Sequence, residues 1–280
     1  MSKSSEHKPW ELPSPPLLSS SDILCPTLEI VRANMLYIAT SDISPKLLNH
    51  LRRIATFKNP EFFARQAMRI ATHSSPRIIS CAEIVDGYLA LPRGCEEALI
   101  EILDKLCVRY SIVDKTNAGN PIKVSFNGKL RPEQQKAVAA LINNRIGTLS
   151  ATTAFGKSVV AANIIAQRKS NTLILVHTKA LMEQWQSVLV KFLTIEHDAP
   201  IEKPRRGRKR IWSPIGCVGS GKDRRSGVID IAIMQSLTDG DSVKEWVRDY
   251  GGVIVDECHH LSAFSFERIM RFANARYVYG

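Results

Sequence analysis

The sequence lacks the features that mark a membrane-spanning, secreted or zinc-binding chain. None of its apolar runs approaches the ~20 residues that a transmembrane helix needs. Residues 1–22 are rich in Ser and Pro and have no apolar core of the signal-peptide type. The six cysteines form no C-x-x-C pair, which argues against a zinc or redox motif. We therefore expect a disordered leader over 1–22, no membrane partner and a cytoplasmic protein.

Positive charge exceeds negative charge in this chain. The 280 residues include 38 Lys and Arg against 27 Asp and Glu, a formal net charge of +11. Such an excess favours a polyanionic partner. Part of it is local, because six of the eight residues in 203–210 are basic. Three readings stay open for this run: a solvated surface insertion, a loop that contacts nucleic-acid phosphates, or a nuclear localisation signal.

Residues 23–115 have the pattern of a small α/β unit. Ser44-Pro45 and Asn59-Pro60 each combine a capping residue with proline at the first helical position, so a helix is expected after each. Asp86-Gly87 is a hairpin turn signal inside the alternating segment 77–91. The other expected elements are a strand over 28–39, a helix over 94–107 and a strand over 110–113. Residues 116–129 are rich in Asn, Gly and Pro and are expected to be a linker.

From residue 130 the pattern changes to alternating helix and strand, which is typical of an α/β fold with a parallel sheet. The expected helices are 132–142, 157–167, 180–192, 243–248 and 264–272. The expected strands are 147–150, 172–176, 228–233, 252–255 and 276–279, with an irregular segment over 193–226. Because the sequence stops within the last of these strands, we expect a fragment of a longer protein.

Residues 151–158, A-T-T-A-F-G-K-S, lie between an expected strand and an expected helix, as a phosphate-binding loop does. Gly156 would let the backbone approach the phosphates, Lys157 would pair with the β- and γ-phosphates, and Ser158 would offer its hydroxyl to magnesium. Ala151 stands at the first glycine of the generic loop, and Ala154 stands where many such loops have glycine, so the backbone has less freedom at the turn. The alternative reading is an ordinary strand–helix turn.

Two adjacent carboxylates, Asp256 and Glu257, follow the apolar run 253–255. A carboxylate at the carboxyl end of a parallel strand points into the crevice where ligands bind. Asp256 is the candidate magnesium ligand, and Glu257 is the candidate base that orients the attacking water. Taken alone, the pair could be two exposed acids at a strand end. Together with the upstream loop it predicts a nucleoside triphosphate hydrolase, because that reaction needs both parts.

Two other patterns look like sites but are not expected to be. Residues 216–223, G-C-V-G-S-G-K-D, have the glycine spacing of a phosphate loop, but Asp223 would repel phosphate and no apolar helix follows. Cys258, His259 and His260 are adjacent, and adjacent side chains diverge in a regular element, which argues against a metal site.

The motifs resemble those of superfamily 2 helicases of the DExH type. Residues 151–158 resemble their first motif, residues 256–259 (D-E-C-H) resemble motif II, and residues 130–134 (L-R-P-E-Q) resemble an upstream element whose glutamine reads adenine. The resemblance implies ATP and Mg²⁺ as cofactors, with Lys157, Asp256 and Glu257 as the catalytic residues and Ser158 with Asp256 as the magnesium ligands. The implied nucleotide-binding residues are Gln134, Ala151, Thr152, Thr153, Ala154, Phe155, Gly156, Lys157 and Ser158.

Further segments resemble the helicase motifs that contact nucleic acid. Residues 176–185 resemble motif Ia, and residues 219–221 and 233–236 resemble two strand-tracking elements. The residues implied to contact nucleic acid are Thr178, Lys179, Gln184, Gly219 and Gln235. The likeness is greatest to the restriction-subunit-like DEAD/DEAH helicases, including those of bacterial conflict systems. It is good over 130–280 and weaker over 28–115.

This resemblance implies a RecA-like P-loop domain over 130–280, a parallel sheet with helices on both faces that is incomplete at its C-terminus, before motif III. The expected function is the ATP-binding half of a DNA helicase or translocase. Its implied partners are nucleic acid, DNA rather than RNA, and the rest of the motor or a restriction or defence protein. Arginine fingers of a second RecA-like domain can be worth ~10³–10⁵ in rate, so the chain alone is expected to bind ATP weakly and to hydrolyse it slowly.

Two other functions stay open at this stage. The chain could be a nucleotide-dependent switch ATPase that never contacts DNA, or a non-catalytic nucleic-acid-binding fragment. The small α/β accessory domain over 23–115 could grip duplex DNA or act as a scaffold whose arginines are only solvated. The arginines in question are Arg52, Arg53, Arg65, Arg69 and Arg77.

Overall fold

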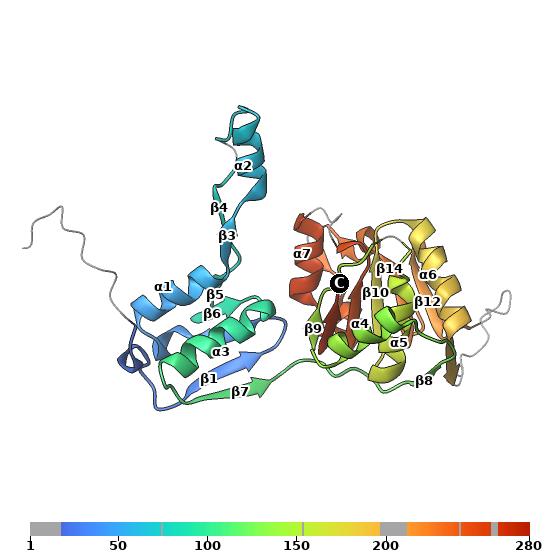
Figure 1. Ribbon diagram of the computed structural model, residues 1–280, viewed down its shortest axis with the longest axis horizontal. Coiled ribbons are helices and arrows are strands. Elements are labelled where there is room, and N and C mark those ends of the chain that lie inside the picture. Colours follow the sequence, from blue (N-terminus) through green and yellow to red (C-terminus); the bar gives the residue numbers. More distant parts are fainter. Residues whose placement is uncertain (1–17, 74, 153, 197–211, 241, 259–262) are drawn as a thin grey trace, which may run out of the picture. The chain divides into compact units, whose positions relative to one another are not determined.

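The computed structural model describes residues 18–73, 75–152, 154–196, 212–240, 242–258 and 263–280, and they form two compact units. One unit runs to Val31 and continues over Leu36–Val113, and the other combines Arg32–Met35 with Asp114–Gly280 (Figure 1). None of the helices in these ranges has both the length and the apolar character that a bilayer crossing requires. The basic run 203–210 and the pair His259-His260 lie outside the described residues.

A five-stranded sheet in the order β5-β6-β2-β1-β7 forms the base of the N-terminal unit. Its strands are β1 (Leu28–Arg32), β2 (Leu36–Ala39), β5 (Glu83–Val85), β6 (Tyr88–Leu91) and β7 (Tyr110–Asp114). Helices α1 (Pro45–Ile54) and α3 (Glu96–Lys105) bury leucines against it. The shared core includes Leu28, Ile30, Leu47, Leu51, Leu99 and Leu103, all at most 1% exposed.

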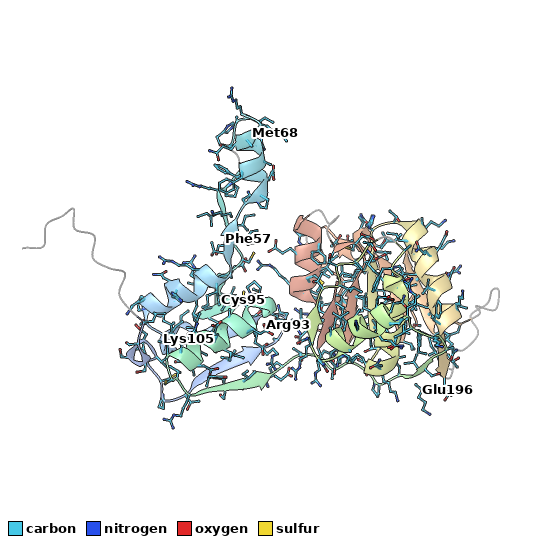
Figure 2. The ribbon with its side chains drawn as sticks, in the orientation of Figure 1. Phe57, Met68, Arg93, Cys95, Lys105 and Glu196 are labelled. Atoms are coloured by element: carbon cyan, nitrogen blue, oxygen red, sulfur yellow. The ribbon has the colours of Figure 1, made fainter. Side chains whose placement is uncertain are left out.

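The start of each of the first two helices is fixed as the sequence predicts. The Ser44 hydroxyl accepts from the Leu47 amide at 3.1 Å, and Pro45 occupies the first position of α1. The Asn59 side chain likewise accepts from the Glu61 amide at 3.1 Å at the start of α2 (Pro60–Ala67). Short strands β3 (Thr56–Lys58) and β4 (Ile78–Ser80) pair below α2, and the three elements form an arm on which Phe57 and Met68 are exposed (Figure 2).

Three expectations for this unit need correction. Residues 28–39 form two strands instead of one, because the chain turns at Ala33, whose amide donates to the Met35 carbonyl. The hairpin at Asp86-Gly87 is confirmed, but it joins only β5 and β6, since Ile78–Ser80 pairs with β3. Residues 20–22 form a short 3-10 turn, and the leader is therefore ordered there: Asp22 is 7% exposed and accepts from the Ser44 hydroxyl at 2.7 Å.

The second unit contains a seven-stranded sheet in the order β13-β12-β14-β10-β17-β18-β9. All neighbours are parallel except β12 and β13. Its strands are β9 (Ile146–Gly147), β10 (Thr172–Val176), β12 (Ile215–Gly219), β13 (Lys222–Arg224), β14 (Ile229–Ile233), β17 (Gly252–Val255) and β18 (Tyr277–Tyr279). Its helices are α4 (Pro132–Ile142), α5 (Lys157–Arg168), α6 (Lys179–Phe192) and α7 (Ala263–Phe272).

Helices cover both faces of this sheet, because the side chains of strand β10 alternate between two hydrophobic cores, each of which includes helix residues. Ile174 and Val176 belong to the core that includes residues of α4, α5 and α6, whereas Leu173 and Leu175 belong to the core that includes residues of α7. Successive side chains of a strand point to opposite faces, so a strand buried on both sides reads as one apolar run. The predicted α/β fold with a RecA-like parallel sheet is confirmed.

The segments expected to be irregular contain strands that the sequence pattern did not reveal. Strand β8 (Lys123–Phe126) lies inside the expected linker 116–129 and pairs with β11 (Leu193–Glu196). Strands β12 and β13 lie inside 193–226. The segment expected as helix 243–248 is a short strand followed by the 3-10 helix η5 (Glu245–Asp249), and β9 begins one residue before the expected position and is shorter.

Candidate active site

The loop between β9 and α5 turns sharply at Gly156 to begin the helix. Gly156 has a φ of +86°, in the left-handed region, and Lys157 is the first residue of α5. A Cβ at this position would lie 2.6 Å from Gln134 Nε2, so an added side chain would strain the left-handed backbone and push the Gln134 amide aside. Ala154 has a φ of +66°, which an L-residue adopts at a cost. Thr153 lies outside the described residues.

Two side chains at the start of α4, those of Arg131 and Gln134, hold this loop through hydrogen bonds to the Phe155 carbonyl. The Gln134 amide, 5% exposed, donates to the Phe155 carbonyl at 2.8 Å, and its Oε1 accepts from the Arg131 amide at 2.9 Å. Arg131 also donates to the Phe155 carbonyl and lies over the Phe155 ring. The sequence singled out Gln134 but gave Arg131 no role. The only sequence signal for Arg131 is its position three residues before Gln134, because residues at this spacing at a helix start can hydrogen-bond to each other.

The acid pair follows β17, between β10 and β18 in the middle of the sheet. The Asp256 amide donates to the Leu175 carbonyl at 3.0 Å, which continues the pairing with β10 by one residue. The Asp256 carboxylate accepts from the Trp185 indole N–H, with 2.7 Å between Nε1 and Oδ2. Trp185 is a second residue that the sequence did not single out, and the Gln-Trp pair in the motif Ia-like segment was its only signal.

The loop and the acid pair meet directly. Lys157 Nζ lies 2.9 Å from Glu257 Oε1, and the side chains are 35% and 28% exposed. An ion pair so open to solvent is worth only about 0–1 kcal/mol, so a bound phosphate could replace Glu257 as the partner of Lys157 at little cost. The structure thus brings Lys157, Asp256 and Glu257 together, while their catalytic roles remain predictions.

A cavity of about 740 Å³ opens between these groups. Its walls come from the phosphate-loop segment, the acid pair and the first two turns of α6, and its size falls within the ~300–1,000 Å³ of typical ligand sites. Ser158 and Asp256 both line it and carry the oxygen ligands that Mg²⁺ prefers. Among the described residues no group of three acidic, His or Cys side chains could hold a metal alone. Proteins usually bind Mg²⁺ through one or two carboxylates together with phosphates, and Asp256 would supply one such carboxylate.

The residues expected to contact nucleic acid lie at or beyond the carboxyl ends of three parallel strands. Thr178, after β10, caps α6 by accepting from the Leu181 amide at 3.2 Å, and it lines the same cavity as Gln184. Lys179 and Gly219 line a second groove of about 590 Å³ between α6 and the β12–β13 hairpin. Gln235 is exposed on a 3-10 turn after β14.

The second groove is more basic than the sequence suggested. It is lined by Lys222, Arg224 and Arg225, from the hairpin that also contains Gly219-Ser220-Gly221. This segment had the glycine spacing of a phosphate loop, but its glycines serve the turn between antiparallel strands. No helix follows it, so the expectation that it is not a phosphate loop agrees with its geometry.

Comparison with known proteins adds a family to this geometry. Residues 127–280, more than half of the chain, match the family model described as the res subunit of type III restriction enzymes. The chain is 24% identical over 188 residues to the probable helicase D10 of Escherichia phage T5, covering 65% of this chain and 36% of that protein. It is 25% identical over 198 residues to the helicase/translocase subunit XPB of general transcription and DNA repair factor IIH from Danio rerio, covering 64% and 24% respectively.

A solved structure shares the fold. The UvsW helicase from bacteriophage T4 matches with a TM-score of 0.60 and 18% identity, over 91% of this chain and 91% of that chain. The chain spans about a third or less of the two relatives above. The matched family, the shared fold and the contact between the loop and the acid pair all point to the same kind of protein. The chain therefore belongs to the family of type III restriction enzyme res subunits, and it shares its fold with the UvsW helicase structure.

Proposed function

We propose that this chain is the ATP-binding half of an ATP-dependent DNA helicase or translocase. The observation that carries the proposal is the 2.9 Å ion pair between Lys157 Nζ and Glu257 Oε1, in the wall of a cavity that Asp256 also lines. Phosphate binding, metal binding and water activation need three kinds of group, and all three converge here.

Each residue has a distinct part in this proposal. Lys157 and the amides at the start of α5 bind phosphate oxygens, because a helix N-terminus favours anions. Ser158 and Asp256 hold magnesium, which neutralises charge on the phosphates when it is bound. Glu257 releases Lys157 and orients the water that attacks. Gln134, already fixed against the loop, is the proposed reader of adenine.

Nucleic acid is the proposed second ligand, and DNA is favoured over RNA. The names of the relatives from phage T5 and Danio rerio refer to a helicase and to a DNA repair helicase/translocase subunit. The groove lined by Lys179, Lys222 and Arg224 supplies positive charge suited to a phosphate backbone. The N-terminal unit has arginines of its own on α1 and on the arm around α2, and we propose that this unit binds duplex DNA. The rest of the motor, or a restriction or defence protein, is the proposed protein partner.

Calorimetric titration of the 280-residue chain with Mg²⁺ and a non-hydrolysable ATP analogue tests the nucleotide site. Heat of binding is expected for the unaltered chain and for Lys191→Ala, at the far end of α6, and none for Lys157→Ala. Absence of heat with the unaltered chain would overturn the motor assignment. In a parallel anisotropy titration with duplex and single-stranded DNA, no binding at low salt would favour a switch ATPase. DNA binding unaffected by nucleotide and by Lys157→Ala would favour a non-catalytic fragment.

A further inference from the structure

Helix α6 connects the outer rim of the nucleotide cavity with its metal-binding side. Thr178 caps the helix, and Leu181 and Gln184 line the cavity near its start. Trp185 follows the cap by about two turns, a rise of ~10 Å, and lines the same cavity. The helix therefore presents one side chain to the acid pair while its first turn faces the region expected to contact nucleic acid.

Trp185 is well placed to fix the acid pair. Its side chain is 4% exposed and packs in the core that includes Val176 and Ile254, so the indole has little freedom to rotate. The indole has one N–H donor, and that donor bonds to Asp256 Oδ2 at 2.7 Å. A hydrogen bond to a carboxylate is short and roughly twice as strong as one between neutral groups.

This bond divides the two carboxylate oxygens of Asp256 between separate tasks. Oδ2 accepts from the indole, and Oδ1 accepts no hydrogen bond from the described part of the chain. The backbone of Asp256 is held at the same time by its amide bond to the Leu175 carbonyl. Both the position and the rotation of the carboxylate are thus set before any metal arrives, and Oδ1 is the oxygen available to a cation.

We propose that Trp185 is a positioning residue that orients the Asp256 carboxylate for Mg²⁺ and couples that carboxylate to helix α6. The inference rests on the proposed function, since it gives Asp256 the metal-binding role. Partners that orient a metal ligand typically contribute 10–100-fold to metal affinity. Removing the indole N–H should therefore raise the Mg²⁺ concentration that nucleotide binding requires and leave nucleotide binding without Mg²⁺ nearly unchanged.

The first test compares three forms of the full chain. Trp185→Phe removes the N–H, and 3-benzothienylalanine at position 185 replaces the N–H with sulfur but keeps the bulk of the ring. Trp246→Phe is the control, because Trp246 lies in the same unit and packs against Tyr250 and Arg225 instead of the cavity. The measurement is the Mg²⁺ concentration that gives half-maximal binding of a fluorescent ADP analogue.

We expect that concentration to rise at least tenfold for both changes at position 185 and to stay constant for Trp246→Phe. Thermal unfolding of each form separates positioning from folding, since the benzothienyl form keeps the packing. An unchanged Mg²⁺ requirement in the benzothienyl form would overturn the inference while leaving the proposed function intact. Failure of the unaltered chain to bind the analogue would overturn both.

The second test observes the bond itself. In a ¹⁵N-correlated spectrum, the indole resonance that disappears in Trp185→Phe reports on the N–H donated to Asp256. We expect it to move on addition of Mg²⁺ with ADP, and again when duplex DNA is added, and to move in neither titration in Asp256→Asn. A resonance insensitive to Mg²⁺ in the unaltered chain would contradict the positioning role, and insensitivity to DNA would remove the coupling to α6.

Discussion

Gly156 is the residue on which the phosphate loop depends most directly. It combines a left-handed backbone with a neighbour, the Gln134 amide, that would have to shift to admit a Cβ. The same Gln134 amide holds the loop through the Phe155 carbonyl. A side chain at 156 would therefore strain the backbone and displace the group that supports the loop.

Gly156→Ala is expected to reduce nucleotide affinity at least tenfold, which corresponds to about 1.4 kcal/mol. The matched control is Gly87→Ala, because Gly87 has a similar φ of +82° but no atom within 4 Å of the added Cβ. Both changes should lower the free energy of unfolding by about 1 kcal/mol through backbone strain. Only the first should affect nucleotide titrations, and equal affinity in the two variants would contradict this account of the loop.

The sequence identified most of the site at this scale, but it missed the residues that hold others in place. Lys157, Asp256 and Glu257 could be predicted because their chemistry and order along the chain are informative. Arg131 and Trp185 act through contacts with Phe155 and Asp256, which are distant in the sequence. Nothing in local spacing reveals such contacts, since an arginine in a helix cap and a tryptophan on an amphipathic helix are ordinary features.

Among the elements, the end of β7 is linked to the segment before β9 by the Asp114 carboxylate, which pairs with Arg145. Burial raises the pKa of Asp114, but hydrogen bonds from the hydroxyl and amide of Thr116 and from Arg145 outweigh burial and hold that pKa well below its ordinary value of 3.8. A pKa lower in the folded state than in the unfolded state adds stability above the unfolded value, and that stability is lost as the pH falls below it.

Thermal unfolding should therefore show a contribution from Asp114 that is present at pH 7 and diminishes below about pH 4. Asp114→Asn is expected to lower the unfolding temperature at pH 7. At pH 3 the unfolding temperatures of the variant and the unaltered chain should differ by less. Asp104→Asn, in the last turn of α3, is the control. If the unaltered chain and Asp114→Asn lost the same stability between pH 7 and pH 3, Asp114 would not be the source of this pH dependence.

The β12–β13 hairpin is the element expected to contact a nucleic-acid backbone. Lys222→Ala should weaken DNA binding to a similar degree for all sequences and reduce the salt dependence of affinity by about one counterion, because phosphate contacts carry no sequence information. Anisotropy titrations at several salt concentrations measure both quantities. Lys105→Ala, on the exposed face of α3, is the control. If Lys222→Ala left the salt dependence of DNA affinity unaltered, the nucleic-acid backbone would not contact this hairpin.

At the scale of elements, prediction was best where local signals agree with one another. Helices α1 and α2 have both a capping side chain and a proline, and β10 and β17 are short apolar runs, so their bounds came out closely. Strands β8 and β12 were missed because they mix polar residues or glycines with few apolar ones. Gly216 in β12 is required by its partner, since a Cβ would lie 1.9 Å from Asp230 Oδ1, and that requirement is visible only in three dimensions.

The whole molecule has two compact units with separate cores, so we expect a nucleotide bound in the C-terminal unit to stabilise that unit alone. Hydrogen exchange measured with and without Mg²⁺ and ADP should show protection in β17, the loop before α5 and the first turn of α6. Residues of β1, β2 and α3 should exchange at unchanged rates, because a ligand stabilises the structure that binds it. Protection spread evenly over both units would contradict this.

The order of the large sheet has a consequence for how the protein is made. Strand β18 lies between β17, which positions the acid pair, and β9, which leads into the phosphate loop, and the Gly280 carbonyl accepts from the Leu149 amide at 2.8 Å. The two halves of the site thus border a strand that the ribosome synthesises after both of them. Until Tyr277–Tyr279 has emerged and inserted, a nascent chain has every proposed nucleotide-binding residue but lacks the strand that joins their supports.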